Sequence, residues 1–374
     1  MPTPRILIVG AGLAGLALGR ALHARGFQAE IVERVAAWGA GGTGIYLPAN
    51  GVRALRTLGL AEAVAARGTV IPRQRLSNHH GRLLTDIDLE EVWGATGPCL
   101  ALHRADLHAI LRDGAQNVPI RMGTTVRSFE QDQTVRVVFD DGSDDEYDLL
   151  VGADGIHSSV RRLAGDARPA RPVGQMSWRF VIPCPPGVTT WSVLLGAGQS
   201  FLTIPIGQGR AYCYCDELSD GRSGVQPTAD LADLRSRFAR FGSPVPEILA
   251  SLDASTEIYA APIEEVAEEW WGPGGRIVLI GDAVHGMSPN MAQGASLAFE
   301  DALVLAETLA TSATVTEAVA ALVARRDARV RWVRVQTHRR DRLRKLPGIV
   351  RDILFRTFGL RIFRANYAPL LSPP

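Results

Sequence analysis

The sequence predicts an α/β protein with a parallel-sheet domain, an interleaved and mostly antiparallel second sheet, and helices at the C-terminal end. Three observations predict this class. A strand, a glycine-rich turn, a helix and a second strand follow one another within residues 5–33. Several β-type runs separated by Pro and Gly occupy residues 173–216, and helical apolar spacing extends over residues 313–345. A chain of 374 residues is also long enough for a core domain plus an inserted or appended one.

The balance of charges gives no reason to expect nucleic acid as a partner. Lys and Arg together number 40 and Asp and Glu 39, so the net charge is +1. Lys345 is the only lysine in the chain. The four cysteines are Cys99, Cys184, Cys213 and Cys215. They lack a second Cys/His pair at zinc-ligand spacing, which predicts no metal site, and their low number predicts a reduced, cytoplasmic protein.

The remaining elements are expected to alternate between helix and strand. In chain order they are a helix at 13–25, a helical stretch at 49–67, antiparallel strands within 71–97, a helix at 105–113, strands around a hairpin within 120–151, a buried strand at 276–280 and a long helix from Ala295. No segment approaches the roughly 18–20 uninterrupted apolar residues of a membrane-spanning helix.

These elements divide the chain into three predicted units. The parallel-sheet domain is discontinuous and comprises residues 1–70, 98–171 and 266–312. The antiparallel-sheet domain comprises residues 71–97 and 172–265, and a helical segment follows at 313–374.

A glycine-rich turn between the first strand and the first helix predicts a dinucleotide site. The residues assigned to it are Gly10, Gly12, Leu13, Ala14, Gly15, Glu33 and Arg34. The first glycine allows the tight turn, the second lets a pyrophosphate approach the backbone, and the third lets helix and strand pack closely. The helix start offers free N–H groups to phosphates, and Glu33, at the end of the second strand, is placed to bind a ribose. The sequence therefore predicts a Rossmann-type site for a cofactor that contains ADP.

A second glycine string, Gly39-Ala40-Gly41-Gly42-Thr43-Gly44, matches the same letters but lacks the same context. It follows a loop around Trp38 and precedes Ile45 to Pro48, which do not form a helix pattern. We expect a flexible loop near the cofactor, and hence a single dinucleotide domain.

Two further motifs turn this prediction toward a flavoprotein. Residues 152–161 read GADGIHSSVR, and residues 281–294 read GDAVHGMSPNMAQG. With the N-terminal glycines, they resemble the three fingerprints of the single-component, class A FAD-dependent aromatic monooxygenases, a family that includes the p-hydroxybenzoate, salicylate and alkylquinolone hydroxylases. The resemblance covers nearly the whole chain. It implies a p-hydroxybenzoate hydroxylase-like fold, FAD bound tightly without a covalent bond in the parallel-sheet domain, and substrate held by the antiparallel sheet.

The resemblance also implies roles for residues of the third motif. Asp282 ends a strand, where the family's carboxylate binds the ribityl hydroxyls of FAD. Gly294 and Ala295 begin a helix whose N-terminus would face flavin N1 and the C2 carbonyl, where the reduced ring is anionic. Pro289 is expected beside the ring where oxygen reacts. Taken alone, Asp282 could instead be a helix cap.

Outside the third motif, Arg104 matches an arginine of the family that contacts FAD. Asp154 and Gly155 match the motif linked to both FAD and nicotinamide binding, although alone they could form a plain turn. His157 and His285 lie inside the motifs, and we expect backbone contacts to hold them rather than a catalytic role.

The family's reaction is implied as well. NADPH or NADH, a transient co-substrate, would reduce the flavin, and O2 would then give a flavin C4a-hydroperoxide that hydroxylates a small, electron-rich aromatic or heteroaromatic compound. The principal alternative is a reductase or dehydrogenase of the same fold that inserts no oxygen, and a flavin-binding protein without catalysis is a third reading. A halogenase is disfavoured because the chain lacks a Trp-x-Trp-x-Ile-Pro segment and an active-site lysine.

The substrate pocket is expected between the flavin and strands at 200–206 and 210–216. By resemblance, Tyr212 matches a substrate-contacting tyrosine of related urate hydroxylases, whereas their Arg and Asp correspond to Ser200 and Asn290 here. Urate is therefore disfavoured, and Tyr212, Pro289 and Asn290 are the predicted catalytic-site residues.

The expected pocket is apolar and weakly polar, with no histidine in residues 158–284, which favours a neutral heteroaromatic substrate over a dianion. The resemblance favours the alkylquinolone branch, because those hydroxylases share the loop Gly42-Thr43-Gly44-Ile45, the pair Trp178-Arg179 and the Arg-rich C-terminal organisation. That pair could equally be structural.

The C-terminal segment Ile349 to Arg364 mixes large apolar residues with four arginines. It could touch a membrane, but packing against the body or a second subunit is the more common outcome. A monomer or a homodimer is expected.

Overall fold

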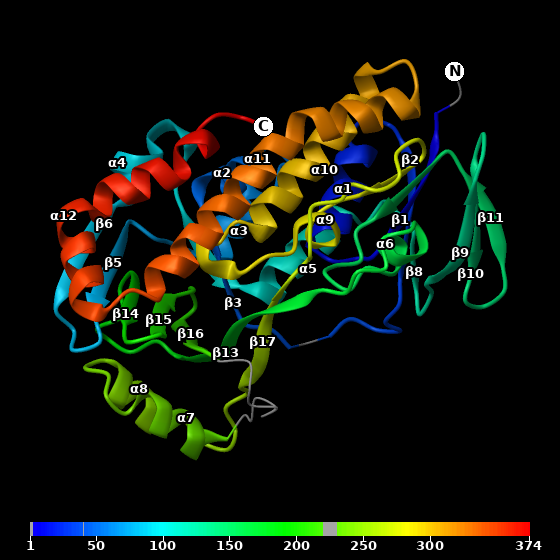
Figure 1. The fold of residues 1–374 in the computed structure, drawn as a ribbon. Coiled ribbons are helices and arrows are strands. Elements are labelled where there is room, and N and C mark those ends of the chain that lie inside the picture. Colours follow the sequence, from blue (N-terminus) through cyan, green and yellow to red (C-terminus); the bar gives the residue numbers. More distant parts are fainter. Residues whose placement is uncertain (1–2, 40, 220–229) are drawn as a thin grey trace.

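The computed structural model describes residues 3–39, 41–219 and 230–374, and a parallel sheet forms its centre (Figure 1). Five strands lie in the order β18-β12-β1-β2-β8, and every pairing is parallel. Their bounds are β1 (Arg5–Val9), β2 (Gln28–Glu33), β8 (Ile120–Met122), β12 (Leu149–Gly152) and β18 (Ile277–Leu279). The central strands are short apolar runs because helices such as α1 (Leu13–His23) and α10 (Gly294–Thr311) cover the sheet. The predicted β-α-β unit at the N-terminus is confirmed.

A second sheet of seven strands has the order β17-β13-β16-β15-β14-β5-β6. Its strands are β5 (Arg73–Asn78), β6 (Leu83–Asp88), β13 (Arg171–Pro183), β14 (Trp191–Leu195), β15 (Gln199–Pro205), β16 (Arg210–Leu218) and β17 (Tyr259–Glu265). All neighbours are antiparallel except β5 and β14. The mostly antiparallel sheet, assembled from two distant stretches of chain, is therefore confirmed.

The two faces of this second sheet bury different side chains because successive residues of a strand point to opposite sides. One face packs under α7 (Leu231–Phe238) and α8 (Val245–Ser251), which lie along the edge of the molecule in Figure 1. The strand residues buried on that face include Trp178, Phe180, Phe201, Cys213 and Cys215. The opposite face carries Tyr212 and Tyr214 into the main core. This face therefore looks toward the parallel-sheet region.

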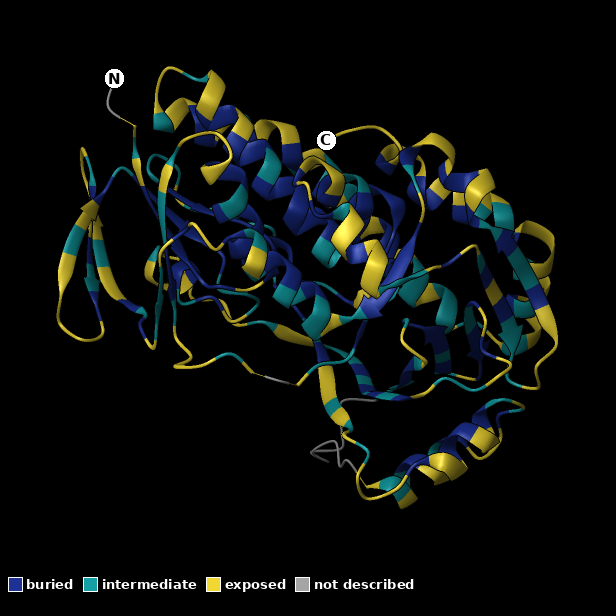
Figure 2. Ribbon diagram, turned by 180° about the vertical axis from the view of Figure 1, so that it is seen from behind, coloured by how far each residue is buried: buried dark blue, intermediate teal, exposed yellow. Residues whose placement is uncertain are grey.

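Two small sheets and several short helices complete the fold. One three-stranded sheet contains β9 (Val126–Gln131), β10 (Val135–Phe139) and β11 (Asp144–Tyr147), and another contains β3 (Gly44–Leu47), β4 (Thr69–Val70) and β7 (Leu100–His103). The short helices are α2 (Ala49–Thr57), α3 (Ala61–Arg67), α4 (Leu89–Trp93), α5 (Arg104–Gly114), α6 (Ser159–Leu163) and α9 (Asp282–His285), with 3-10 turns η1 (Gly94–Thr96), η2 (Pro289–Met291) and η3 (Ala368–Leu370). The first of these sheets projects from the body, and its outer strands are exposed in Figure 2.

Two helices close the chain, as the sequence predicts. Helix α11 (Val315–Arg344) begins with a capping box between Thr314 and Glu317. Helix α12 (Gly348–Tyr367) packs against β6, where Thr85 Oγ1 donates to Phe355 O at 2.6 Å. Its outer side exposes Ile349, Val350 and Ile353. Among the described residues, no helix is both long and apolar enough to cross a membrane.

The structure corrects the single helix expected at 49–67. Two helices, α2 and α3, occupy this stretch. Gly59 adopts φ +71, and the N–H of Leu60 donates to Leu55 O at 2.8 Å, which ends α2 in a left-handed turn. Hydrophobic periodicity alone did not reveal that break.

The strands expected over 71–97 extend only to Asp88. The Asp88 carboxylate accepts a hydrogen bond from Glu90 N at 3.0 Å and so starts α4, which η1 follows. Helices α7 and α8 were not expected at all, because the sequence prediction assigned this region to the antiparallel sheet. Residues 231–238 and 245–251 of this region are helical instead, and Phe238 of α7 is buried against the sheet.

Substitution Phe238→Ala should lower the free energy of unfolding by about 3–5 kcal/mol, because it empties a fully buried site. The ring contacts Trp178 and Phe201 at centroid distances of 6.2 and 5.6 Å. Chemical denaturation measures the change, and Ser236→Ala, an exposed position of the same helix, is the control. Equal stability of the two variants would contradict the assignment of this helix to the core.

Candidate active site

Three loops leave the parallel sheet at one edge. Strands β1, β12 and β18 are neighbours, with Val9 opposite Gly152 and Gly152 opposite Leu279. Because parallel strands end on the same side, the three sequence motifs that follow them begin next to one another. The carboxyl edge of an open parallel sheet is where ligands of such folds bind.

The first motif depends on glycines at close backbone approaches. A methyl group added at Gly10, which has φ +105, would lie 2.6 Å from Ala153 O at the start of the second motif. One added at Gly15 would lie 1.9 Å from Gly10 O. At Gly12 it would meet nothing within 4 Å, and this residue is exposed at the start of α1. Gly10 and Gly15 therefore serve packing, whereas Gly12 borders open space.

The third motif meets the first. A methyl group added at Gly281 would lie 3.0 Å from the Ala14 side chain, and one at Gly294 would lie 3.6 Å from Asp282 Oδ1. Asp282 is exposed, and among described residues its carboxylate makes no hydrogen bond or ion pair, while its backbone carbonyl accepts from Gly286 N at 3.1 Å. It is the first residue of α9 rather than the end of a strand, and it caps no helix through its side chain. An unpaired carboxylate thus lies beside the start of α10.

That helix start is available to a ligand. α10 begins at Gly294, as predicted, and no side chain caps it. Its first N–H groups, including that of Ala295, have no partner within the helix and carry the positive end of the helix dipole.

The other predicted cofactor residues line the same edge of the sheet. Glu33 ends β2, and its carboxylate accepts from Ala11 N at 2.8 Å and from Val35 N at 3.1 Å. Arg34 and Arg104 are exposed, and neither has an acidic partner in the described part of the chain.

Asp154 is held by local contacts. Its carboxylate accepts from the side chain of Ser158 at 2.5 Å, and from the N–H and hydroxyl of Ser159 at 2.7 and 2.8 Å. It also accepts from Val160 N at 3.1 Å. The side chain therefore anchors the start of α6 after Gly155, which has φ +81. This geometry favours the structural alternative for Asp154 itself.

Neither motif histidine is held by the backbone, which corrects the expectation for both. His157 is exposed, and its Nε2 lies 3.2 Å from Glu264 Oε2. His285 is fully buried, and its Nε2 lies 2.7 Å from Asp301 Oδ2. The sequence prediction missed this partner because Asp301 lies in the middle of an apolar helix.

Asp301 is the centre of a buried charge cluster. Its Oδ1 accepts from Arg326 Nε at 2.7 Å, and its Oδ2 accepts from Gly281 N at 3.0 Å. Arg326 is fully buried and also donates to Glu300 at 2.7 Å. Burial alone would raise the pKa of Asp301, but the charges and hydrogen bonds of Arg326 and His285 outweigh it and lower the pKa to about 2. Asp301 of α10, supported by Arg326 of α11, thus holds the Gly281-Asp282 turn in place.

The adjacent acids Glu300 and Asp301 gave one signal that the sequence prediction could have used. They stand side by side in an otherwise apolar run of α10, where buried charges need partners. Arg326 gave none, because it is one of many arginines in α11.

The second sheet faces this edge with Tyr212 and Tyr214. Tyr212 lies under the glycine loop, since a methyl group added at Gly44 would fall 2.3 Å from its Cβ. Burial raises the pKa of Tyr212 to about 12, so its hydroxyl stays protonated at neutral pH. The second glycine string leads into β3 and not into a helix, in agreement with a loop rather than a second nucleotide fold. Ala40 of this string lies outside the described residues.

The pair Trp178-Arg179 divides between the two faces. Trp178 is buried among the residues under α7. The Arg179 guanidinium lies 5.6 Å from the centre of the Tyr214 ring, and among described residues it has no acidic partner. Only Arg179 therefore reaches the face that carries the tyrosines.

The remaining predicted residues lie in η2. Pro289 is exposed and begins this turn. Asn290 Nδ2 donates to Ser288 Oγ at 2.9 Å and to Asp341 Oδ1 of α11. Ser200 Oγ donates to Asp216 Oδ1 at 2.6 Å on the second sheet. Asp216 and Asp341 were not singled out from the sequence.

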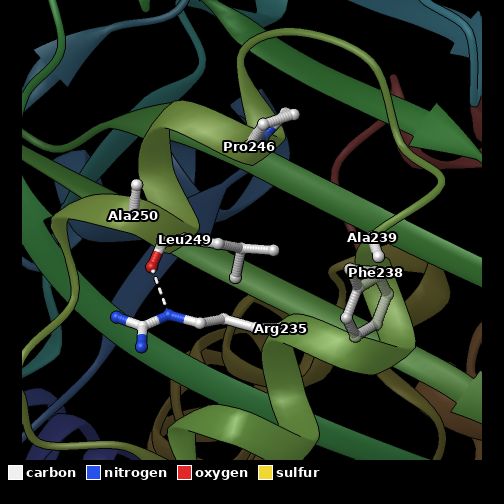
Figure 3. A pocket seen from close by; sticks show the side chains of 6 residues that line it. All are labelled: Arg235, Phe238, Ala239, Pro246, Leu249 and Ala250. Carbon is white, nitrogen blue, oxygen red and sulfur yellow. Dashed lines mark hydrogen bonds between the residues drawn. The ribbon is translucent and has the colours of Figure 1, made fainter.

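Two hollows elsewhere do not belong to this site. One, of about 480 Å³, lies between α7 and α8, where Arg235 Nε donates to Leu249 O (Figure 3). It is on the far face of the second sheet. Another, of about 580 Å³, is bordered by Asp166, Arg168 and Trp270. No group of three or more His, Cys, Asp or Glu within residues 3–39, 41–219 and 230–374 could hold a metal ion.

Comparison with known proteins agrees with this geometry. A family model described as an FAD binding domain matches residues 3–334. An aurachin C monooxygenase/isomerase of Stigmatella aurantiaca is 34% identical over 319 residues, which cover 84% of this chain and 83% of that protein. A 2-heptyl-3-hydroxy-4(1H)-quinolone synthase of Pseudomonas aeruginosa is 33% identical over 340 residues, covering 89% and 87%.

Among solved structures, Klebsiella pneumoniae HpxO complexed with FAD and uric acid has a TM-score of 0.90 at 26% identity, covering 99% of this chain and 97% of that chain. The fold and the site thus define an FAD-dependent monooxygenase, with FAD as its cofactor. The chain belongs to the FAD binding domain family, in its branch of aromatic monooxygenases. The expected family, fold and cofactor are confirmed.

Substitution Asp301→Asn should lower the free energy of unfolding by roughly 3–5 kcal/mol, because it leaves part of the Arg326 charge buried and unpaired. It should also change the response to acid. The folded-state pKa of Asp301 is depressed, so its stabilising contribution is complete above about pH 4 and is lost as the pH falls toward about 2.

Denaturation curves between pH 2 and pH 7 measure both effects on wild type and variant. Glu307→Gln is the control, since Glu307 lies on the same helix but its side chain is half exposed. An unchanged acid limb in the Asp301→Asn variant would show that the carboxylate is not the titrating group.

Proposed function

We propose that this enzyme uses NADPH or NADH and O2 to hydroxylate a small heteroaromatic compound, with a neutral quinolone-type ring as the favoured substrate. The observation that carries the proposal is the convergence of three motifs at one edge of the parallel sheet, opposite a face of the second sheet that presents tyrosines. A quinolone-type substrate is favoured because relatives named for aurachin C and for a 4(1H)-quinolone are 34% and 33% identical to this chain.

The residues at the sheet edge fit FAD. Open space at Gly12 and the uncapped start of α1 suit a diphosphate, which needs close approach to backbone N–H groups. The Glu33 carboxylate suits a ribose, and Arg34 and Arg104 supply cations without acidic partners in the described chain. Leu13, Ala14 and Gly15 complete the α1 side of this site.

At the other end of the cofactor, Asp282 is placed to accept hydrogen bonds from ribityl hydroxyls. Gly294 and Ala295 would direct the positive end of α10 toward the pyrimidine edge of the ring, where negative charge accumulates on reduction. Asp154 and Gly155 would shape the loop that meets Gly10 rather than bind directly. When bound, FAD supplies the electron transfer and the oxygen chemistry.

The chain's own task on the substrate side is to orient the ring and exclude water. Tyr212 keeps its proton and can donate a hydrogen bond, and Pro289 and Asn290 of η2 would border the same space. Ser200 and Asn290 are neutral where the resemblance places an Arg and an Asp in urate hydroxylases, which disfavours urate. We further propose a cytoplasmic protein, monomeric or homodimeric, with the domain boundaries that the sequence predicts.

The function is tested by following NADPH and NADH oxidation by the FAD-loaded protein with quinolones, indoles, phenols and purines. Substrate-dependent O2 uptake and a product heavier by one oxygen are expected for the quinolones. Reduction of the flavin coupled to a reduced product, without O2 uptake, would instead identify a reductase or dehydrogenase. Failure of any compound to stimulate flavin reduction would favour a flavin-binding protein without catalysis.

A matched glycine pair tests the proposed phosphate contact. Gly12→Ala should fold normally but weaken FAD binding about 10-fold, because its methyl group enters the space left for the diphosphate. Gly15→Ala should instead lower the free energy of unfolding by about 3 kcal/mol, because its methyl group meets a backbone oxygen. FAD titration and thermal unfolding distinguish the two effects, and equal FAD affinity of Gly12→Ala and wild type would exclude the contact.

Substitution Asp282→Ala should weaken FAD binding roughly 10- to 100-fold and abolish turnover at ordinary FAD concentrations, since hydrogen bonds to a charged group contribute about 1.5–3 kcal/mol. The fraction of flavin retained after gel filtration measures the effect. Substitution His157→Gln, at an exposed residue of the second motif, should lower stability but leave flavin retention unchanged. If Asp282→Ala retains FAD as well as wild type does, the carboxylate is not a ligand.

A further inference from the structure

The C-terminal end of α11 reaches the active-site face of the second sheet. In Figure 1 this orange helix runs along the body toward the second sheet, and its last turns contact side chains of β13 and β16. Asp341 and Arg344 are three residues apart on it, so they lie on one side of the helix. Both make polar contacts with side chains of the second sheet.

These contacts form a continuous polar network from the sheet to η2. The Arg344 guanidinium donates to both oxygens of Asp216 and, at 3.2 Å, to Gln175 Oε1. Gln175 Nε2 then donates to Asp341 Oδ1 at 3.2 Å. Asn290 Nδ2 donates to the same oxygen from the η2 side. Asp341 is therefore the residue at which the second sheet, α11 and η2 meet.

The two carboxylates of this network differ in one respect. Asp216 is fully buried, and both of its oxygens are used, by Ser200, Tyr214 and Arg344. Asp341 uses only Oδ1, and among described residues Oδ2 has no hydrogen-bond partner. Oδ2 also keeps some accessible surface, and the residue as a whole is half-buried. A purely structural link would be expected to resemble Asp216.

Asp341 sits in surroundings that strengthen a polar contact. Burial raises its pKa, while the hydrogen bonds from Gln175 and Asn290 and the charge of Arg344 offset part of that rise. Water is partly excluded here, and a hydrogen bond to an ionised acceptor is stronger than a neutral one. Asn290, which donates to Asp341, directly follows Pro289, the exposed first residue of η2.

We propose that Asp341 Oδ2 accepts a hydrogen bond from a ring N–H or O–H group of the substrate and thereby selects heteroaromatic compounds that carry such a donor. The inference rests on the proposed function and deepens it by naming the group that this site recognises. A carboxylate that draws on the proton of a ring donor also raises the electron density of the ring, which electrophilic hydroxylation requires. Asp341 is thus a specificity-determining residue, supplied by α11 rather than by the sheet or the third motif.

The test compares ligand pairs that differ only in the donor. Quinolone, indole and phenol ligands, each with its N-methyl or O-methyl counterpart, are titrated into the oxidised, FAD-loaded protein, and the flavin absorbance reports binding without turnover. Wild type should bind the donor form of its preferred scaffold about 10- to 100-fold more tightly than the methylated form.

The Asp341→Asn variant sharpens the test because the network fixes its orientation. Gln175 and Asn290 both donate to the bound oxygen, so the amide oxygen of the variant should take that place and its NH2 group should occupy the free position. The preference for donor ligands should then fall to within about 3-fold, and a 4-methoxyquinoline, whose ring nitrogen is an acceptor, should bind more tightly than to wild type.

Asp327→Asn, on the same helix but paired with Trp271 and Arg331, should keep the wild-type preference. FAD content and the midpoint of thermal unfolding show whether each variant is folded. If a variant is not folded, the comparison of donor and methylated ligands with wild type still decides the question. Equal binding of every donor and methylated pair by wild type would overturn the inference, as would an undiminished preference in Asp341→Asn. Donor-selective binding without any hydroxylated product would contradict the proposed function and leave the role of Asp341 supported.

Discussion

The parallel register of β1, β12 and β18 is the constraint on which the candidate active site depends. These three strands come from residues far apart in the chain, yet each is followed directly by one of the glycine-containing motifs. Their in-register pairing places Gly10 against Ala153, and the packing of α1 places Ala14 against Gly281. A side chain at Gly10 or Gly15 would force the backbones that it meets apart, so the proposed FAD site and the core of the sheet are specified by the same atoms.

Buried charge then fixes the third loop more firmly than backbone contacts could. Asp301 of α10 holds both the Gly281 amide and His285, while Arg326 of α11 neutralises it. Such a cluster is costly to desolvate, and it contributes specificity of arrangement rather than a large net stability. Its consequence is positional, because the start of α10 and the Asp282 carboxylate keep a defined relation to each other. Both are features on which the proposed flavin site relies.

The proposed substrate side is built from the alternation of side chains along the second sheet. Trp178 and Cys213 point to α7 and α8, whereas Arg179, Tyr212 and Tyr214 point to the parallel-sheet region. Helix α11 crosses from one region to the other, with Arg326 in the charge cluster and Asp341 beside η2. Helix α11 therefore contributes both Arg326, which stabilises the Gly281-Asp282 turn through Asp301, and Asp341, which we propose selects the substrate.

Local sequence determined the α/β class, the first β-α-β unit, the second antiparallel sheet, the start of α10 at Gly294 and the three motifs, because strand and helix periodicities and glycine turns are properties of neighbouring residues. It did not reveal the turn at Gly59 that ends α2, the helices α7 and α8, or the partners of His285, Asn290 and Ser200. Those partners, Asp301, Asp341 and Asp216, lie 16 to 51 residues away in the chain. Only the tertiary structure could decide them, because a buried charge is stabilised by whichever opposite group the packing of sheets and helices brings within hydrogen-bond distance.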